Sequence, residues 1–331
     1  SASNIHPGLE NVTHYTNEDI FQLREQPRHL LVIGGGPIGM EMAQAHRRLG
    51  GRVTVIEARQ ALGKDDPDLA AIVLAALRDE GVEILEETAV NAVETAGDGI
   101  RLHLQGVAGE FDACGSHLLV AAGRQPNVEG LGLQAAGIEF DRTGIKVGPG
   151  LRTSNRKVYA IGDVIGGMQF THAAGYHAGL VIRSALFRQP VRVNPALIPW
   201  VTYTSPELGH IGMSEEQARQ RYGDRVKVLN ADYAGNDRAC ADGNTAGRLK
   251  LVAGPRGRLL GADVAGTQAG ELINLLSLAL SKGMTMKDLA GFVAPYPTLG
   301  ELVRRAAISY FAEAPANKWI RRIVRLLRQF G

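Results

Sequence analysis

A glycine-rich segment near the start of the chain has the pattern G-x-G-x-x-G and follows a short apolar run. Gly34, Gly36 and Gly39 are its three glycines, and Glu57 ends a second apolar run. In such a pattern the first glycine permits a tight turn, the second lets a pyrophosphate approach the backbone, and the third lets a helix pack on a strand. We therefore predict a dinucleotide site that includes Gly34, Gly36, Pro37, Ile38, Gly39 and Glu57.

Glu57 sets the expected choice of dinucleotide. Its carboxylate can accept hydrogen bonds from a ribose 2′-hydroxyl and would repel a 2′-phosphate, which favours NAD over NADP. Arg59 weakens this preference because a guanidinium two residues further on can pair with that phosphate. NADP therefore remains an alternative.

The glycine pattern also has an interpretation without a dinucleotide, as a glycine-rich turn in an unrelated α/β protein. The strand pattern before the glycines and the helix pattern after them disfavour this interpretation.

Composition restricts the class of protein. The chain has 331 residues, of which 45% are hydrophobic and 21% charged, and its net charge is +2. These values are typical of a globular protein of two or three domains and give no sign of a nucleic-acid partner. Cys114 and Cys240 are the two cysteines and form no paired motif, which indicates a reducing compartment, so we expect a cytoplasmic protein. The histidines show no metal-ligand spacing with these cysteines, and no metal site is predicted.

The elements that must position the site follow from periodicity and from capping residues. Asp66 before Pro67, and Ser214 three residues before Gln217, predict two helix N-termini. Alternating runs over residues 89–107 predict an antiparallel meander between elements of a βαβ pattern. The predicted strands are 30–33, 52–57, 82–85, 117–122, 157–161, 200–203, 209–212, 248–252 and 258–264, and the longer predicted helices begin at 37, 67, 171, 270, 299 and 317. The fold class is therefore α/β.

Several further motifs occur in the order found in one protein family. Residues 121–127 read A-A-G-R-Q-P-N, residues 159–163 read Y-A-I-G-D, and residues 295–301 read P-Y-P-T-L-G-E. The segment 202–207, the D-R-A triplet at 237–239 and the G-E-L-I run at 270–273 match as well. The chain resembles the flavin-dependent pyridine nucleotide–disulfide oxidoreductases, in particular their mercuric reductase-like and dihydrolipoamide dehydrogenase-like branch. The resemblance extends from about residue 5 to residue 310.

This resemblance implies a domain organisation. A Rossmann-like NAD(P)-binding domain with an antiparallel meander would occupy residues 12–126, and the C-terminal part of an FAD-binding domain residues 127–192. An α+β interface domain that forms a homodimer would occupy residues 193–316, followed by a basic amphipathic helix at 317–331. The family's first segment, which has another G-x-G-x-x-G and a redox-active C-x-x-x-x-C, has no counterpart in these residues. We therefore expect part of a longer enzyme, inactive by itself.

The resemblance also assigns roles to individual residues. Glu41 would lie beside the nicotinamide and the flavin, and Asp163 would bind the ribitol of FAD. Tyr296 and Glu301 would act at the flavin of the partner subunit. The dihydrolipoamide dehydrogenases have histidine at the position of Tyr296, whereas tyrosine, with an ordinary pKa of about 10, is a poor base at neutral pH. Gly123, Gly162 and Asp163 are the residues that the resemblance assigns to FAD.

Three functions follow as hypotheses. The first is an enzyme that passes hydride from NAD(P)H to FAD and on to a disulfide-like or metal acceptor. Mercuric reductases share the tyrosine but have a C-terminal cysteine pair that these residues lack, so the acceptor stays open. The second is a non-catalytic NAD-binding and dimerisation fragment. The third is contact with a membrane surface through the basic helix 317–331, for which packing on the interface domain is the favoured alternative.

Overall fold

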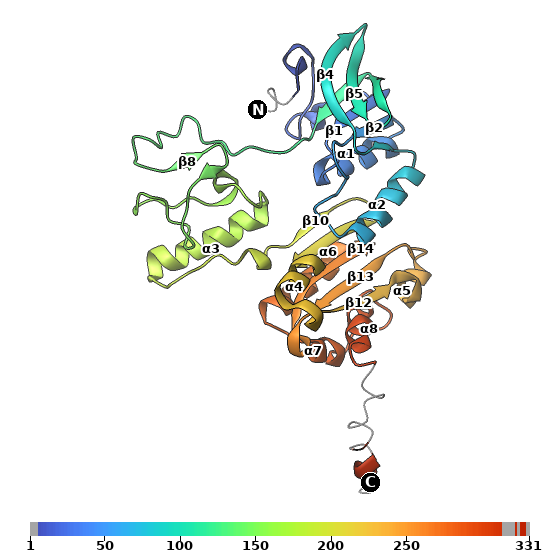
Figure 1. Ribbon diagram of the computed structural model, residues 1–331, viewed down its shortest axis with the longest axis vertical. Helices are drawn as coiled ribbons and strands as arrows, with labels where there is room; N and C mark the ends of the chain where they lie inside the picture. Colours follow the sequence, from blue (N-terminus) through green and yellow to red (C-terminus); the bar gives the residue numbers. More distant parts are fainter. Residues whose placement is uncertain (1–5, 313–321, 323–324, 329–331) are drawn as a thin grey trace. The chain divides into compact units, whose positions relative to one another are not determined.

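The computed structural model describes residues 6–312, 322 and 325–328, and the chain forms two compact units (Figure 1). The first unit consists of Ser1–Gln60 and Glu83–Trp200, and the second of Ala61–Val82 and Val201–Gly331. Parallel and antiparallel sheets occur together with helices, so the predicted mixed α/β fold is confirmed.

The first unit is built on a parallel sheet with the strand order β3-β2-β1-β7. Ile33 at the end of β1 pairs with Ile56 of β2 and with Val120 of β7, so the loops after these strands leave one edge of the sheet together. Ligands of open α/β sheets bind outside that edge. The elements are β1 (His29–Ile33), α1 (Pro37–Arg48), β2 (Arg52–Ile56), β3 (Glu83–Leu85) and β7 (His117–Val120).

A three-stranded antiparallel sheet lies between β3 and β7 in the sequence and contains β4 (Ala89–Ala96), β5 (Gly99–Gly106) and β6 (Gly109–Gly115). Leu102 and Leu104 of β5 are buried in one core cluster with Leu31 of β1 and Leu118 of β7. This shared core fixes the small sheet to the parallel one (Figure 1).

The rest of the first unit contains little regular structure apart from one long helix. The two-residue strands β8 (Phe140–Asp141) and β9 (Gly144–Ile145) form a hairpin, and α3 spans Thr171–Phe187. The strand predicted at residues 157–161 is wrong: in the described chain this segment makes only an isolated bridge between Tyr159 and Arg152. Its buried residue Ala160 belongs to a small core with Leu133 and Ile145, so the apolar pattern is explained by packing and not by a ladder.

The second unit has a five-stranded sheet in the order β10-β11-β14-β13-β12, with helices packed on it. Ile211, Leu251 and Val264 belong to its main core, together with Leu276 of α6 and Val303 of α8. The strands are β10 (Trp200–Thr202), β11 (Glu207–Gly212), β12 (Lys227–Asp232), β13 (Arg248–Ala253) and β14 (Leu259–Gly266). The helices are α2 (Pro67–Asp79), α4 (Glu215–Tyr222), α5 (Asp237–Ala241), α6 (Ala269–Ser281), α7 (Met286–Gly291) and α8 (Glu301–Ser309).

Both predicted helix N-termini are confirmed. The side chain of Asp66 accepts a hydrogen bond from the backbone of Leu69, and Ser214 and Gln217 form a reciprocal capping box. The predicted helix 317–331 lies largely outside the described residues. None of the helices in the described part of the chain has the length and apolar character needed to cross a membrane.

Candidate functional site

The three glycines of the β1–α1 loop have different surroundings. Gly34 has a φ of +110°, and a β-carbon there would lie 2.6 Å from the carbonyl oxygen of Ala121. A β-carbon on Gly39 would lie 1.9 Å from the carbonyl oxygen of Gly34. A β-carbon on Gly36 would meet nothing within 4 Å. Backbone packing therefore requires Gly34 and Gly39, whereas the space beside Gly36 is open to a ligand.

The N-terminus of α1 lies at this open space. Gly36 is the N-cap in an extended conformation, provides no side-chain cap, and is followed by Pro37 in the first helical turn. The first backbone N–H groups of a helix have no partner within the helix, and the helix dipole favours negative charge there. Gly36, Pro37 and Ile38 are the residues at this helix N-terminus, a type of site that can bind an anion. Glu41, half-buried, follows about one turn further along α1.

Glu57 stands directly after β2 and is bound to the glycine loop. Its Oε2 accepts a hydrogen bond of 2.7 Å from the backbone N–H of Gly35, and its Oε1 accepts one of 2.9 Å from that of Arg59. The carboxylate is half-buried and each oxygen has a further lone pair for a ligand hydroxyl. The structure therefore brings the predicted ribose-binding acid to the predicted pyrophosphate loop.

The two motifs that the resemblance assigned to FAD meet through a side chain. Arg124, in the loop after β7, lies with its Nη1 3.5 Å from Oδ2 of Asp163 and also donates to the carbonyl of Gln169. Gly123 has a φ of +115°, and a β-carbon there would meet nothing within 4 Å. The ion pair is partly exposed and contributes little to stability, but it shows that the guanidinium of Arg124 lies beside the Asp163 carboxylate.

Tyr296, in the second unit, is paired with a residue that the sequence did not assign to the site. Its hydroxyl donates a hydrogen bond of 2.9 Å to Oδ2 of Asp237 at the start of α5. This hydrogen bond and the charge of Asp237 raise the pKa of Tyr296, and Glu301 adds a smaller effect in the same direction. Tyr296 is thus a protonated, exposed hydrogen-bonding group at neutral pH and not a base. Glu301, the first residue of α8, accepts from the backbone of Thr298 at 3.4 Å.

A buried row of charged groups crosses the sheet of the second unit. His210, Asp263 and Lys250 occupy paired positions on β11, β14 and β13. The Nδ1 of His210 lies 2.5 Å from Oδ1 of Asp263, and Nζ of Lys250 lies 2.6 Å from Oδ2 of Asp66, the N-cap of α2. Burial opposes the charge of His210, but Asp263, together with the carbonyl of Gly212, outweighs it and raises the pKa of His210. The ion pair of Lys250 and Asp66 joins α2 to the sheet.

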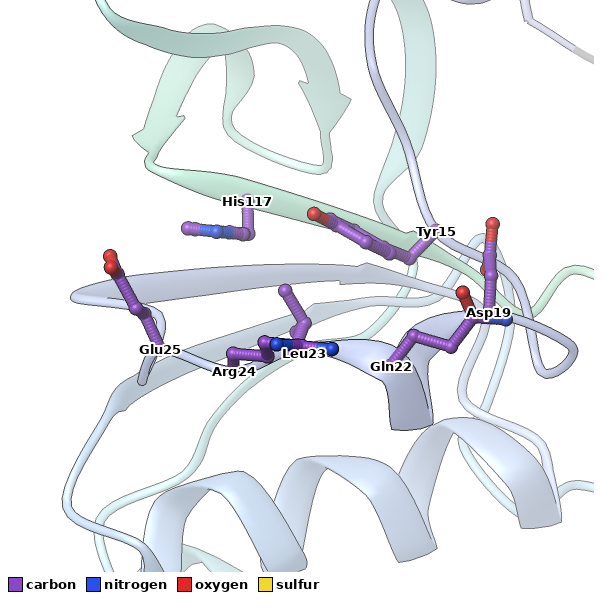
Figure 2. Close-up of a pocket in the computed structure, with 7 residues that line it drawn as sticks. All are labelled: Tyr15, Asp19, Gln22, Leu23, Arg24, Glu25 and His117. Atoms are coloured by element: carbon purple, nitrogen blue, oxygen red, sulfur yellow. The ribbon is translucent and has the colours of Figure 1, made fainter.

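A cavity of about 520 Å³ in the first unit is lined by none of the predicted site residues, and Figure 2 shows the side chains that do line it. The rings of Tyr15 and His117 stack in its wall with centroids 5.9 Å apart. Its charged side chains have both signs, and this mixture selects no class of ligand. The lining residues are Tyr15, Asp19, Gln22, Leu23, Arg24, Glu25 and His117.

Comparison with protein families gives two matches. Residues 2–178 match the model of the pyridine nucleotide-disulphide oxidoreductases, and residues 198–307 match the dimerisation domain of the same proteins.

Individual relatives agree with these matches. A mercuric reductase of Bacillus cereus is 35% identical over 94% of this chain and 49% of its own length. A dihydrolipoyl dehydrogenase of Bacillus subtilis is 35% identical over 88% of this chain and 64% of its own. The Cu(II) complex of the HOCl-induced flavoprotein disulfide reductase RclA from Escherichia coli has a TM-score of 0.84 at 28% identity, covering 92% of this chain and 69% of that one. The chain thus spans about half the length of the first of these relatives.

Proposed function

Because this chain belongs to the pyridine nucleotide-disulphide oxidoreductase family, we propose that it is part of an FAD-dependent NAD(P)H oxidoreductase. The complete enzyme would pass hydride from NAD(P)H to FAD and then reduce a disulfide-like or metal acceptor. The open space beside Gly36, with Glu57 bound to the same loop, is the observation that carries this proposal.

In this proposal the β1–α1 loop binds the nicotinamide dinucleotide. The backbone N–H groups of Gly36 and Ile38 hold the pyrophosphate and Pro37, which has no N–H, lies between them, while Gly34 and Gly39 keep the loop tight against β1 and α1. Glu57 accepts the ribose hydroxyls and repels a 2′-phosphate, so NAD is preferred and NADP is the alternative. The carboxylate of Glu41 would face the nicotinamide end. These assignments rest on the residue types and on the geometry of the loop.

The residues after β7 would form the second part of an FAD site. FAD supplies the hydride-accepting ring when it is bound. Asp163, which lies beside Arg124, would accept hydrogen bonds from the ribitol, and Gly123 would let the cofactor approach the backbone. Gly162, beside which Ala174 of α3 leaves no room for a β-carbon, would set the turn that leads into Asp163. The open space beside Gly123 is compatible with such an approach.

We assign Tyr296 and Glu301 to the partner's active site in a homodimer. The hydroxyl of Tyr296 donates its one proton to Asp237, so its oxygen would offer a lone pair to the acceptor substrate, while Glu301 holds the start of α8. This arrangement makes the dimer the active form. The domains of the proposal are 12–126 for NAD(P), 127–192 for the second part of the FAD domain, 193–316 for dimerisation and 317–331 for a basic helix, in a cytoplasmic enzyme.

A visible absorption spectrum of the purified chain, taken before and after addition of FAD and NADH, tests the proposal. A flavin band that stays with the protein through gel filtration and bleaches with NADH would support an oxidoreductase site. A protein that binds NADH and takes up no FAD would favour the second hypothesis, a nucleotide-binding and dimerisation fragment. Cys114 and Cys240 are both free thiols, so no disulfide formed by them would take electrons from the reduced flavin and restore its band.

A further inference from the structure

His177 is a buried residue of α3 that no part of the proposed function uses. Only 5% of its surface is exposed, although α3 presents much of its length to solvent. Its Nδ1 lies 3.3 Å from the backbone nitrogen of Gly162, which donates a hydrogen bond to it. The residue before the proposed ribitol-binding Asp163 is therefore held by a side chain fifteen positions further along the chain.

This hydrogen bond fixes the protonation state of the ring. Since the Gly162 N–H donates, Nδ1 of His177 must have a lone pair, and the proton of the neutral ring is on Nε2. Burial lowers the pKa of His177, which keeps the ring neutral at pH 7. The Nε2 atom is buried and has no hydrogen-bond partner among the described residues. Within the described residues, Nδ1 is therefore the ring nitrogen of His177 that makes a hydrogen bond.

The backbone at Gly162 has a conformation and surroundings that other residues would not easily adopt. It has a φ of +68° and begins the 3₁₀ turn Gly162–Ile165, and a β-carbon there would lie 2.9 Å from that of Ala174 on α3. The turn thus lies directly against α3, and its first N–H would be buried without a partner if His177 offered no acceptor. The next residue, Asp163, is the one that Arg124 contacts.

We infer that His177 is a positioning residue for the flavin site: the acceptor Nδ1 holds the Gly162 N–H and so sets the backbone from which Asp163 reaches the ribitol. The inference rests on the proposed FAD site, but its first step, the hydrogen bond to Gly162, does not depend on FAD.

Two variants of His177 distinguish the effect of its hydrogen-bond acceptor from the effect of its ring shape. His177→Asn places an amide oxygen near the position of Nδ1 and keeps the acceptor, whereas His177→Phe keeps a planar ring and removes it. His177→Gln, whose amide group reaches the Nε2 position instead, replaces the phenylalanine variant if that protein does not fold. Arg183→Gln, at an exposed position of the same helix, is the matched control.

The first measurement is the hydrogen-exchange rate of the Gly162 amide in the full chain, followed by NMR. Labelling with 13C-carbonyl isoleucine and 15N-glycine restricts the observed amide signals to glycines that directly follow an isoleucine. We expect exchange in His177→Phe to be about tenfold faster than in the wild type, and His177→Asn and Arg183→Gln to match the wild type. Equal protection in wild type and His177→Phe would overturn the inference.

The second measurement is the FAD dissociation constant of the same proteins, from quenching of flavin fluorescence. We expect His177→Asn to bind like the wild type and His177→Phe to bind about tenfold more weakly. If His177→Phe binds FAD as tightly as the wild type although its Gly162 amide exchanges faster, His177 does not position the flavin site. If the wild-type chain takes up no FAD, the proposed flavin site fails, and amide exchange alone decides whether His177 holds Gly162.

Discussion

Gly39 lies so close to Gly34 that a β-carbon on Gly39 would come within 1.9 Å of the Gly34 carbonyl oxygen. Gly39→Ala must therefore shift the loop or the helix, and we expect a loss of about 1–3 kcal/mol in the free energy of unfolding. Urea unfolding followed by circular dichroism measures it. Gly179→Ala in α3 is the control, because a β-carbon there meets nothing within 4 Å. A Gly39→Ala protein as stable as this control would show that the close packing is not real.

Glu57 should determine the choice between NADH and NADPH. Glu57→Gln removes the negative charge and keeps one oxygen, which can accept the Gly35 N–H, whereas the hydrogen bond from the Arg59 N–H is lost. The contact with the glycine loop therefore stays while repulsion of a 2′-phosphate disappears. We expect the ratio of the NADPH and NADH dissociation constants, measured by calorimetry, to fall by about tenfold. Arg59→Gln is the complementary change and should weaken NADPH alone. An unchanged ratio in Glu57→Gln would remove Glu57 from the ribose site.

The buried pair of His210 and Asp263 should make stability depend on pH above neutrality. The pKa of His210 is raised in the folded protein above its usual value of 6.5. A raised folded-state pKa contributes stability that is complete below the unfolded pKa and is lost as pH rises through the folded pKa. We therefore expect the free energy of unfolding to fall as the pH increases from about 6 to 9, by about 1.4 kcal/mol for each unit of pKa difference.

A paired variant isolates this effect from other titrations. His210→Leu with Asp263→Leu removes both buried charges together and leaves neither uncompensated. Its unfolding free energy, measured in urea over the same pH range, should depend less on pH than that of the wild type. Identical pH profiles would mean that His210 does not titrate as its contacts require.

Lys250 should be essential for stability through its contact with Asp66. Its side chain is 6% exposed, and removing its charge leaves the Asp66 carboxylate buried and uncompensated. We expect Lys250→Met to lose about 3–5 kcal/mol in the free energy of unfolding. Adding Asp66→Asn should recover much of this loss, because asparagine still caps α2 without a charge. A double variant no more stable than Lys250→Met would contradict the ion-pair interpretation.

Local patterns made several elements of both units predictable. The glycine loop, the strand before it and the cap at Asp66 each depend on residues a few positions apart, and the structure has them at the predicted positions. The strand β12 was not predicted because Lys227–Asp232 has polar residues at both ends, and its pairing with β13 defines it.

Contacts between distant positions were beyond sequence reasoning. The residues Tyr296 and Asp237 are 59 positions apart, and Lys250 and Asp66 are 184 apart. The packing of α2 on the sheet brings Asp66 to Lys250, and the chain around α5 and before α8 brings Asp237 to Tyr296. The false strand at 157–161 has the same origin, because an apolar run does not reveal whether a neighbouring strand is available to it.

The affinity of NADH for Gly36→Ala, compared with the wild-type chain, tests the dinucleotide site most directly. A β-carbon at this position meets no protein atom within 4 Å and the φ of −79° suits alanine, so folding should be unaffected. The β-carbon of the alanine would occupy the space assigned to the pyrophosphate. We predict an NADH dissociation constant at least about tenfold higher by calorimetry, with an unchanged urea midpoint. Equal NADH affinity in the two proteins would contradict the proposed site.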